Sequence, residues 1–400
     1  MKALFLENDL KRIIMLKALR PFLRSAPVGR FFPMQYAEVP EPDLPGPRWL
    51  KVRVKSCGLC GSDVHFIHMD MDPKCFPAAI PGVTRKYIGH ELIAEVVETG
   101  DEVEAFRSGD RVALRIDWPS CFQMEIDPAC RQCRSGNYML CENLGKKNPL
   151  VIDTGGGFSP FMVMHQSQPY KIPDTLTDER ALLIEPMASA IHGVMKRPPK
   201  AGDNVLVIGG GTIGLLCVLA VKTLAPEADV CCLVRYPFQA DAAKMLGADQ
   251  IISERADAFS QVARLTDGAY HRGYFGNEIV LGGFDTVYDS VGNDGSIGDG
   301  LRWVRGGGNL VILGINFKPG KLDYSPVWCQ EIHVTGINCH ADESDGETSF
   351  DMAARLLSQT PRPVETILTH RFPMSQFKTA VETFMNKGRS RAIKIVLDHS

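Results

Sequence analysis

The pattern of apolar and polar positions changes character twice along the chain, near residues 188 and 340. Before residue 188, short apolar runs with many β-branched residues are separated by glycine and proline, as in WLKVRVKSCG (49–58), LIAEVVETG (92–100) and DRVALRI (110–116). Runs of this length, bounded by turn residues, are typical of strands in a compact β-rich domain. The first part of the chain is therefore predicted to be β-rich.

Between residues 188 and 340, runs of strand length alternate with helical ones. VLVIGGG (205–211) predicts a strand, and the apolar stretch after it predicts a buried helix that ends before Pro226. Further strands are predicted at 229–235, 284–292, 309–315 and 332–337, and a further helix at 238–248. This alternation indicates a parallel, doubly wound sheet. After about residue 340 the pattern predicts two helices, 349–359 and 374–388, and a last strand, 391–398.

Composition narrows the class of protein. A chain of 400 residues is long enough for two or three domains, and its net charge of −3 gives no electrostatic basis for binding nucleic acid or an anionic membrane. Its 12 cysteines are too sparse for a small secreted disulfide scaffold. No stretch approaches the roughly 18 apolar residues of a spanning helix, and the N-terminus lacks the apolar core of a secretory signal. We therefore expect a cytoplasmic protein without nucleic-acid or membrane partners.

Two segments stand apart from the main pattern. Residues 10–24 are basic and somewhat amphipathic. They are interpreted as a surface insertion of the first domain, with a membrane-surface or transit helix as the alternative. Residues 268–283 separate a predicted helix from the strand at 284–292, and they are interpreted as an inserted loop.

A glycine motif lies at the first strand-to-helix turn of the second part. Gly209, Gly211 and Gly214 form GxGxxG directly after a predicted strand and at the start of a predicted helix. The first glycine makes a tight turn, the second lets the backbone approach a pyrophosphate, and the third lets helix and strand pack closely. The helix N-terminus, which includes Thr212 and Ile213, offers N–H groups to the phosphates. The motif therefore predicts a dinucleotide site.

The end of the second strand indicates which dinucleotide is bound. NAD-binding versions place Asp or Glu about 20 residues after the glycines, where it accepts a hydrogen bond from the ribose 2′-hydroxyl. Here Val234 cannot accept that bond, and Arg235 can pair with a 2′-phosphate. NADP is therefore favoured over NAD, with an ordinary exposed cation as the alternative interpretation of Arg235.

Residue types that commonly bind zinc gather in the β-rich part. One group lies within CGLCGSDVH (57–65) and another within CRQCRSGNYMLC (130–141). GHE (89–91) follows a long loop, and Glu185 precedes the dinucleotide-binding part. Thiolate, imidazole and carboxylate are the ligands that zinc takes in proteins. These groups are therefore candidate metal sites.

With these motifs the chain resembles the zinc-dependent medium-chain dehydrogenases, close to their polyol and threonine dehydrogenase branch. The likeness extends over about residues 35–397. It rests on five motifs in the family's order: CGLCGSDVH, GHE, CRQCRSGNYMLC, IEPMASAIHG (184–193) and VLVIGGGTIG (205–214).

The resemblance implies an α/β architecture of two domains. A discontinuous, β-rich GroES-like catalytic domain would comprise residues 1–187 and 340–400, and a doubly wound Rossmann domain would comprise residues 188–339. The resemblance also implies a homodimer or homotetramer, often formed by edge pairing of the cofactor-domain sheets. The strand at 309–315 and the segment after it are candidates for that edge.

The resemblance further implies a catalytic zinc that Cys60, His90 and Glu185 hold or border. Glu91 would be a direct ligand or a neighbour that exchanges with water. Such a zinc keeps one coordination position open for the substrate. Cys57 matches a family position that is not a ligand, and it is interpreted as a packed thiol.

A proton relay is implied in the same way. Ser62 would take the proton from the alcohol, and the proton would pass through the cofactor ribose to His65. Asp63 would orient the relay or a zinc ligand, with a turn-capping role as the alternative. Lys394 matches a basic family position near the cofactor pyrophosphate, with a solvated strand lysine as the alternative.

The second cysteine group resembles the family's structural zinc lobe, in which four cysteines are spaced C-x2-C-x2-C-x7-C. Cys130, Cys133 and Cys141 match three of these positions, and Asp127 occupies the first. Asp127 is expected to complete the site, because carboxylate oxygen is an acceptable zinc ligand. A ligand from Cys121 on a folded-back loop and loss of the metal are the alternatives.

The sequence thus predicts a zinc-dependent oxidoreductase that transfers a hydride between an alcohol or polyol, or its carbonyl product, and NADP(H). The alternatives are an NAD-dependent threonine- or sorbitol-dehydrogenase-like enzyme, a zinc-free double-bond reductase and a non-catalytic dinucleotide-binding protein. The resemblance does not extend to the substrate, because loops of this architecture border the substrate cleft or the subunit contacts. Unusual segments of that kind lie near 10–35, 66–88, 118–127 and 268–283.

Overall fold

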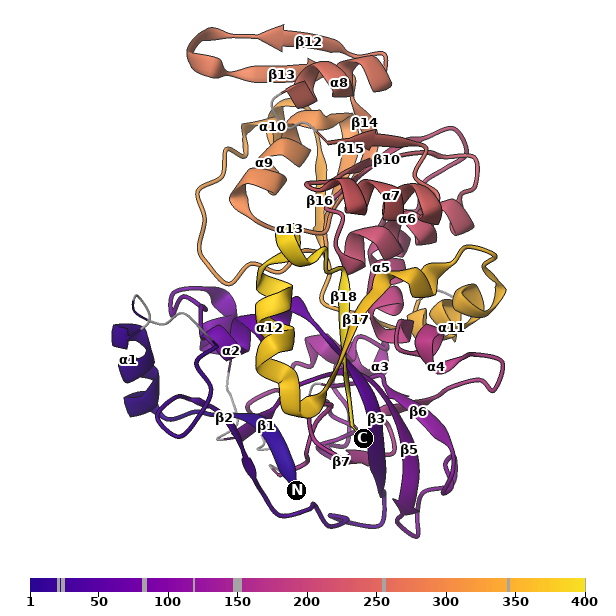
Figure 1. Ribbon diagram of the computed structural model, residues 1–400. Helices are drawn as coiled ribbons and strands as arrows, with labels where there is room; N and C mark the ends of the chain where they lie inside the picture. Colours follow the sequence, from indigo (N-terminus) through magenta and orange to yellow (C-terminus); the bar gives the residue numbers. More distant parts are fainter. Residues whose placement is uncertain are drawn as a thin grey trace. The chain divides into compact units, whose positions relative to one another are not determined.

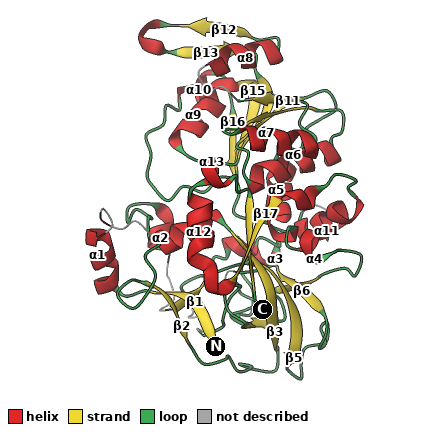
Figure 2. Cartoon of the chain, viewed as in Figure 1, coloured by secondary structure: helices red, strands yellow, loops and turns green. Residues whose placement is uncertain are grey.

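The computed structural model divides into two compact units (Figure 1). Unit 1 comprises Met1–Glu185 and Leu368–Ser400, and unit 2 comprises Pro186–Ile367. Figure 2 shows that strands dominate unit 1, whereas strands alternate with helices in unit 2. The model describes residues 1–19, 22, 26–80, 85–117, 119–146, 153–253, 257–343 and 346–399.

Unit 1 is built around a seven-stranded sheet in which alternate apolar residues face the core. The strand order is β17-β18-β3-β5-β6-β8, and β7 also pairs with β3. Leu50, Val52 and Val54 alternate along β3 and are buried, as the strand pattern predicts. The strands are β3 (Trp49–Leu59), β5 (Glu91–Thr99), β6 (Arg111–Leu114), β7 (Phe161–His165), β8 (Pro169–Lys171), β17 (Leu368–Pro373) and β18 (Lys394–Asp398).

The strand register in unit 1 brings distant parts of the sequence together. β5 and β18 both run antiparallel to β3, on its two sides. Gly58 on β3 therefore lies opposite Glu91 on β5, and Leu59 lies opposite Ile395 on β18. The ends of these three strands consequently place the 57–65, 89–91 and 394 regions side by side.

The N-terminal insertion forms a small layer of its own. β1 (Lys2–Glu7) pairs antiparallel with β2 (Met34–Glu38) and β4 (Arg85–Tyr87), and α1 (Leu10–Leu19) lies between β1 and β2 in the chain. α1 buries Leu16. Residues 20, 21 and 23–25 of the predicted insertion lie outside the described part of the chain. The other helices of unit 1 are α2 (Gly61–His68), α3 (Arg131–Arg134), α4 (Asp178–Ala181), α12 (Phe377–Met385) and α13 (Lys387–Ser390), and α5 (Ile184–Lys196) crosses the boundary.

Unit 2 contains the doubly wound sheet that the sequence predicts. Its six strands are parallel in the order β11-β10-β9-β14-β15-β16. The strands are β9 (Asn204–Ile208), β10 (Asp229–Leu233), β11 (Gln250–Ile252), β14 (Phe284–Asp289), β15 (Val304–Ile312) and β16 (His333–Gly336). The helices are α6 (Thr212–Leu224), α7 (Pro237–Leu246), α8 (Ala258–Leu265), α9 (Asp294–Trp303), α10 (Ser325–Cys329) and α11 (Ser349–Gln359).

Of the two candidates predicted for the edge of this sheet, the strand at 309–315 and the segment after it, the strand is not at the edge. The predicted candidate, 309–315, overlaps β15, which pairs with β14 on one side and with β16 on the other. The edge strand on this side is β16, because it is the last strand in the sheet order and pairs with β15. A run of apolar residues marked both strands, but only the pairing shows which one is outermost.

The segment at 268–283 is a β-hairpin, and its interpretation as a loop was wrong. β12 (Ala269–Arg272) pairs antiparallel with β13 (Glu278–Leu281), and the hairpin carries these labels in Figure 1. Val280 is buried in the core of unit 2, and Arg302 on α9 donates to the carbonyl of Glu278 at 2.9 Å. Glycines at both ends of the segment concealed two strands of only four residues each.

The return to unit 1 lies later in the chain than the predicted residue 340. Residues through Ile367 belong to unit 2. His192 Nδ1 and Glu343 Oε1 are 2.6 Å apart, and Arg362 donates to the carbonyl of Met245 at 3.4 Å. The regular strand–helix alternation ends near 340, but the chain continues to pack on the same unit.

Candidate metal and dinucleotide sites

Three side chains from two strand ends form a compact group of atoms in unit 1 that could hold a metal ion, and we call it the metal-binding group. Cys60, His90 and Glu91 each offer one ligand atom, and these atoms lie within 4.8 Å of one another. Cys60 follows β3, and Glu91 begins β5 directly after His90. The sheet register therefore assembles the CGLC and GHE motifs, which the sequence predicts to act together. A thiolate, an imidazole and a carboxylate make a donor set that suits zinc.

Asp63 holds the two halves of this group together. Its Oδ2 accepts a hydrogen bond from the N–H of Cys60 at 3.0 Å, and its Oδ1 accepts one from the N–H of Gly89 at 3.1 Å. Oδ1 also lies 3.8 Å from Nδ1 of His90. Asp63 thus caps the first turn of α2 and orients both metal-binding segments, so the two predicted roles coincide.

The charges in the group favour a thiolate at Cys60. Burial alone would raise the pKa of Cys60, but the hydrogen bond and charge of His90 lower it below its ordinary value. Burial alone would lower the pKa of His90, but the charges of Asp63, Cys60 and Glu185 raise it well above its ordinary value. The thiolate form is the one that binds metal.

Two further carboxylates, Glu185 and Asp117, interact with His90 of the metal-binding group. Glu185 lies in the first turn of α5 and is buried. It is not among the three residues whose ligand atoms lie within 4.8 Å of one another. Asp117, which sequence reasoning missed, places Oδ2 3.9 Å from Nδ1 of His90. Its only sequence signal is its place shortly after a predicted strand.

Lys394 is not the solvated strand lysine considered as an alternative. Its side chain is 2 % exposed, its Nζ donates to the carbonyl of Leu59 at 3.3 Å, and it forms an ion pair with Glu91. Gly58 makes room for this pair, because a Cβ there would lie 2.5 Å from both Glu91 Oε2 and Lys394 Cε. Lys394 therefore neutralises the innermost carboxylate of the metal-binding group. Its contact with the cofactor pyrophosphate stays a prediction.

The residues of the predicted proton relay lie on α2, directly after Cys60. Ser62 is in the first turn, and His65 lies one turn further along. His65 Nδ1 is 2.7 Å from Oδ1 of Asp70, which sequence reasoning did not single out. A carboxylate at this distance holds a proton on Nδ1 and orients the ring. Asp70 lies five residues after His65 and beyond the end of α2, so no helical spacing marked this pair in the sequence.

The glycine turn of unit 2 has the backbone that the motif requires. Gly209 has φ = +110°, a conformation that side chains disfavour. Gly211 is the N-cap of α6, and a Cβ there would meet nothing within 4 Å. A Cβ on Gly214 would lie 1.9 Å from the carbonyl oxygen of Gly209. The turn therefore leaves a bare helix N-terminus, which is suited to bind phosphate.

Strand β10 is followed by an apolar and then a cationic residue. Val234 is buried, whereas Arg235 is exposed with its guanidinium 5.4 Å from the ring centre of Tyr236. Gln239 Oε1 accepts hydrogen bonds from the N–H groups of Arg235 and Tyr236, each at 3.2 Å. The turn that presents Arg235 is thus held by α7.

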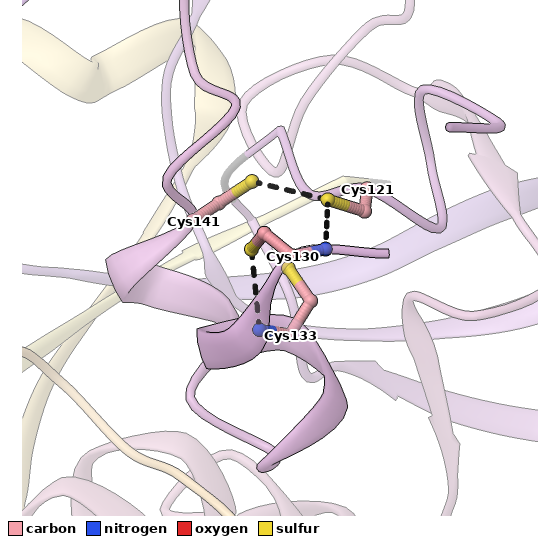
Figure 3. A group of neighbouring side chains, drawn as sticks. All are labelled: Cys121, Cys130, Cys133 and Cys141. Atoms are coloured by element: carbon pink, nitrogen blue, oxygen red, sulfur yellow. Dashed lines mark hydrogen bonds between the residues drawn. The ribbon is translucent and has the colours of Figure 1, made fainter. Parts of the chain in front are cut away.

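A second group of four ligand atoms lies in the lobe after β6. The sulfur atoms of Cys121, Cys130, Cys133 and Cys141 are within 4.8 Å of one another, and Figure 3 shows the four side chains gathered. Asp127, the predicted fourth ligand, is exposed and is not in this group. The structure corrects that expectation, because the 121–126 turn folds back and Cys121 accepts a hydrogen bond from the N–H of Cys130 at 3.3 Å.

The backbone of the lobe also favours a thiolate at Cys130. Burial raises the pKa of Cys130, but the N–H groups of Cys133 and Glu142 outweigh that effect and lower it to about 6. Each of these N–H groups lies 3.4 Å from the Cys130 sulfur. Donors of this kind are typical of sulfurs that carry negative charge.

Comparison with known proteins agrees with this geometry. Residues 46–174 match the family model described as alcohol dehydrogenase GroES-like domain, and residues 212–358 match the one described as zinc-binding dehydrogenase. The chain is 28% identical over 362 residues to sorbitol dehydrogenase of Halalkalibacterium halodurans, which covers 90% of this chain and 94% of that protein.

Two further proteins give similar matches. L-threonine 3-dehydrogenase of Yersinia pestis (strain Pestoides F) is 28% identical over 365 residues, covering 90% of this chain and 95% of that protein. A crystal structure of a zinc-binding dehydrogenase from Sinorhizobium meliloti 1021 bound to NADP superposes with a TM-score of 0.68 at 26% identity, covering 91% of this chain and 95% of that chain. No helix in the described part of this chain is both long and apolar enough to cross a membrane.

Proposed function

Because the chain belongs to the zinc-dependent medium-chain dehydrogenase family, we propose that it oxidises an alcohol or polyol, or reduces the corresponding carbonyl, with NADP as its hydride carrier. The observation that carries this proposal is the group formed by Cys60, His90 and Glu91, whose ligand atoms lie within 4.8 Å of one another. Ser62 and His65 follow the first ligand directly on α2. A non-catalytic binding protein would have no need to assemble both features.

The donor set fits a catalytic zinc. We propose Cys60 and His90 as ligands together with Glu185, and Glu91 as a ligand or an exchanging neighbour. A zinc ion bound here would act as a Lewis acid toward the substrate oxygen. Asp63 holds the ligand segments in place through the N–H groups of Cys60 and Gly89. The Lys394 ammonium balances the charge of Glu91, so that the metal-binding group does not accumulate negative charge.

The remaining residues handle the proton. In the oxidation direction Ser62 would accept the proton of the substrate hydroxyl, and His65 would release a proton to solvent. A bound dinucleotide would supply ribose hydroxyls to connect the two residues. Asp70 supports this role because its carboxylate, 2.7 Å from Nδ1 of His65, fixes the orientation of the imidazole ring. In the reduction direction the same groups return a proton to the carbonyl oxygen.

The proposal of NADP rests on the end of β10. Arg235 is exposed there, and Val234 occupies the position at which a carboxylate would accept a bond from an unmodified ribose. The Arg235 guanidinium is held over the Tyr236 ring, so its donors are presented from a fixed turn. Both the cation and the lack of an opposing carboxylate favour the 2′-phosphate.

Replacing Arg235 with serine is expected to lower kcat/KM for NADP about 10- to 100-fold and to leave the value for NAD nearly unchanged. A charge-assisted hydrogen bond contributes roughly 1.5–3 kcal/mol, and that contribution is lost only with the phosphorylated cofactor. Steady-state kinetics with both cofactors measure the ratio. Arg272→Ser, on the exposed strand β12, is the matched control. A wild-type preference for NAD would contradict the proposal.

The substrate is tested with a panel of alcohols, polyols, amino alcohols and carbonyls, read at the NADPH absorbance band. Turnover of polyols or simple alcohols supports the proposed function. Turnover of threonine-like amino alcohols alone would favour the alternative that the Yersinia pestis relative suggests. Binding of NADP without turnover of any compound, together with the absence of zinc, would favour a non-catalytic protein.

We further propose that the chain forms a homodimer or homotetramer through the edge of the unit 2 sheet. β16 is the outermost strand on that side, and Val334 on it is 44% exposed. Trp328 and Tyr324, on and before α10, are also largely exposed. An open apolar edge is prone to aggregation unless another strand pairs with it.

Sedimentation velocity is expected to show no monomer at micromolar concentration, and a monomer would contradict the proposal.

A further inference from the structure

The helix of the N-terminal insertion turns apolar side chains toward solvent. Leu10 and Ile14 on α1 are 69% and 59% exposed, and Ala18 and Leu19 are exposed as well. On its inner side α1 buries Leu16. Figure 1 shows α1 at the periphery of unit 1. The helix therefore packs on unit 1 through a narrow contact and presents most of its apolar surface outward.

The exposed apolar residues form a stripe that lysine borders on both sides. Leu10, Ile14 and Ala18 are spaced four residues apart, so they lie on one face of the helix. Lys11 precedes Ile14 by three residues and Lys17 follows it by three, so the two lysines flank this stripe. Both lysines are exposed. Apolar residues gathered on one exposed face, with a polar border, mark a contact site.

The charge of this segment is positive throughout. Glu7 and Asp9, the acidic residues directly before α1, form ion pairs with Arg12, and within the described part of the chain Lys11 and Lys17 form none. From residue 10 to residue 37 the sequence contains no aspartate or glutamate, and its cations are Lys11, Arg12, Lys17, Arg20, Arg24 and Arg30. The net charge of −3 for the whole chain therefore conceals a cationic segment.

We infer that α1 lies on an anionic lipid bilayer, with its apolar stripe among the acyl chains and Lys11 and Lys17 at the lipid phosphates. An apolar helix face flanked by lysine is the pattern by which helices lie in the plane of a membrane surface. The alkyl stems of lysine stay at the apolar boundary while the ammonium groups reach the headgroups. Anionic lipids attract cations near the surface, so burial and charge act in the same direction.

Other partners would satisfy one of these two features at the expense of the other. A nucleic acid would bind the cations but leave Leu10 and Ile14 in water. A second copy of this chain, related by a two-fold axis through the stripe, would bring Lys11 and Lys17 against the same lysines. Phe22 and Phe31, also in the insertion, are exposed too. Exposed phenylalanine and leucine beside cations favour a bilayer.

Vesicle binding tests the inference on the full chain. The protein is expected to cosediment with vesicles of phosphatidylcholine and phosphatidylserine in equal parts, more than with phosphatidylcholine alone, and less as salt is raised. Ile14→Ser should lower the partition coefficient for the mixed vesicles at least about tenfold. Lys17→Gln should lower it about fivefold. Failure to bind the mixed vesicles at low salt, or undiminished binding by both variants, would overturn the inference.

Helix α7 of unit 2 supplies matched controls. Lys244 and Met245 on this helix are both exposed. Met245→Ser and Lys244→Gln therefore make comparable changes of side chain on an exposed helix surface away from α1. Both should bind the mixed vesicles as wild type does. A loss as large as that of Ile14→Ser and Lys17→Gln would overturn the inference, because the effect would then not be specific to α1.

A measurement on the unaltered chain covers the case in which a variant does not fold. Hydrogen–deuterium exchange, followed by peptide mass spectrometry, compares the protein with and without mixed vesicles. Peptides from residues 10–19 should become protected when the vesicles are added, whereas peptides from α7 should exchange at the same rate in both states. Unchanged exchange over residues 10–19 in protein that sediments with the vesicles would overturn the inference.

Two further readouts address the other partners. Duplex DNA should not displace the protein from mixed vesicles, and Ile14→Ser should sediment as wild type does without lipid. Displacement by DNA, or dissociation of the Ile14→Ser protein into smaller species, would overturn the inference. None of these measurements depends on turnover. A chain that turns over no substrate can still bind the vesicles through α1, and an active dehydrogenase can fail to do so.

Discussion

Replacing His90 with alanine is expected to abolish turnover while NADP still binds with near wild-type affinity. His90 supplies one of the three candidate ligand atoms that lie within 4.8 Å of one another in unit 1, whereas the glycine turn that we propose to bind the dinucleotide lies in unit 2. Loss of a residue that only orients a metal ligand typically costs about 10- to 100-fold in activity. Loss of a ligand itself should exceed that range. Initial rates with the best substrate, together with NADPH fluorescence titration, measure both quantities.

The control for this variant is a histidine of the same chain outside the group. His271→Ala removes an exposed imidazole on β12 and should leave turnover and zinc content unchanged. Metal analysis then shows whether the loss of turnover in His90→Ala accompanies the loss of one zinc ion. A His90→Ala enzyme that retains wild-type turnover with its metal would show that the catalytic site lies elsewhere.

The proximity of Cys60 and His90 could be expected from the sequence because both lie in motifs of the family that the chain resembles. Cys60 and His90 lie in short motifs that flank predicted strands, and antiparallel pairing of those strands brings their ends together. The role of Asp63 was predictable only in outline. Its two carboxylate oxygens accept hydrogen bonds from the N–H groups of Cys60 and Gly89, which are 29 residues apart. This link depends on the sheet register and not on the spacing within the motif.

Other features depend on contacts that no local pattern encodes. Asp127 occupies the expected spacing, yet the fold brings Cys121 to the lobe cysteines because a turn reverses the chain after β6. In the sequence, Lys394 is one polar residue of a predicted terminal strand. In the structure, β18 lies beside β3, and the ammonium group of Lys394 is buried against Glu91. In both cases the decisive partner lies outside the local motif: Cys121 is nine residues before Cys130, and Lys394 reaches Glu91 from a strand at the other end of the chain.

The second large effect is expected from a substitution in the glycine turn of unit 2. Gly214→Ala is expected to weaken NADP binding at least about tenfold and to destabilise the protein by about 1–3 kcal/mol, the usual cost of overpacking. The added Cβ would lie 1.9 Å from the carbonyl oxygen of Gly209 and 2.7 Å from Oγ of Ser290, so backbone must move. That movement would displace the start of α6, which offers its N–H groups to the pyrophosphate.

Gly211→Ala separates packing from cofactor contact. A Cβ on Gly211 meets nothing within 4 Å, and its φ of −84° suits alanine. Urea unfolding of Gly211→Ala without cofactor should therefore match wild type, while NADP binding falls because the new methyl group occupies the space through which the pyrophosphate approaches. Gly214→Ala should lose both stability and binding. Equal unfolding midpoints for Gly214→Ala and wild type would contradict the close packing of α6 on the turn, and undiminished NADP binding by both variants would place the cofactor elsewhere.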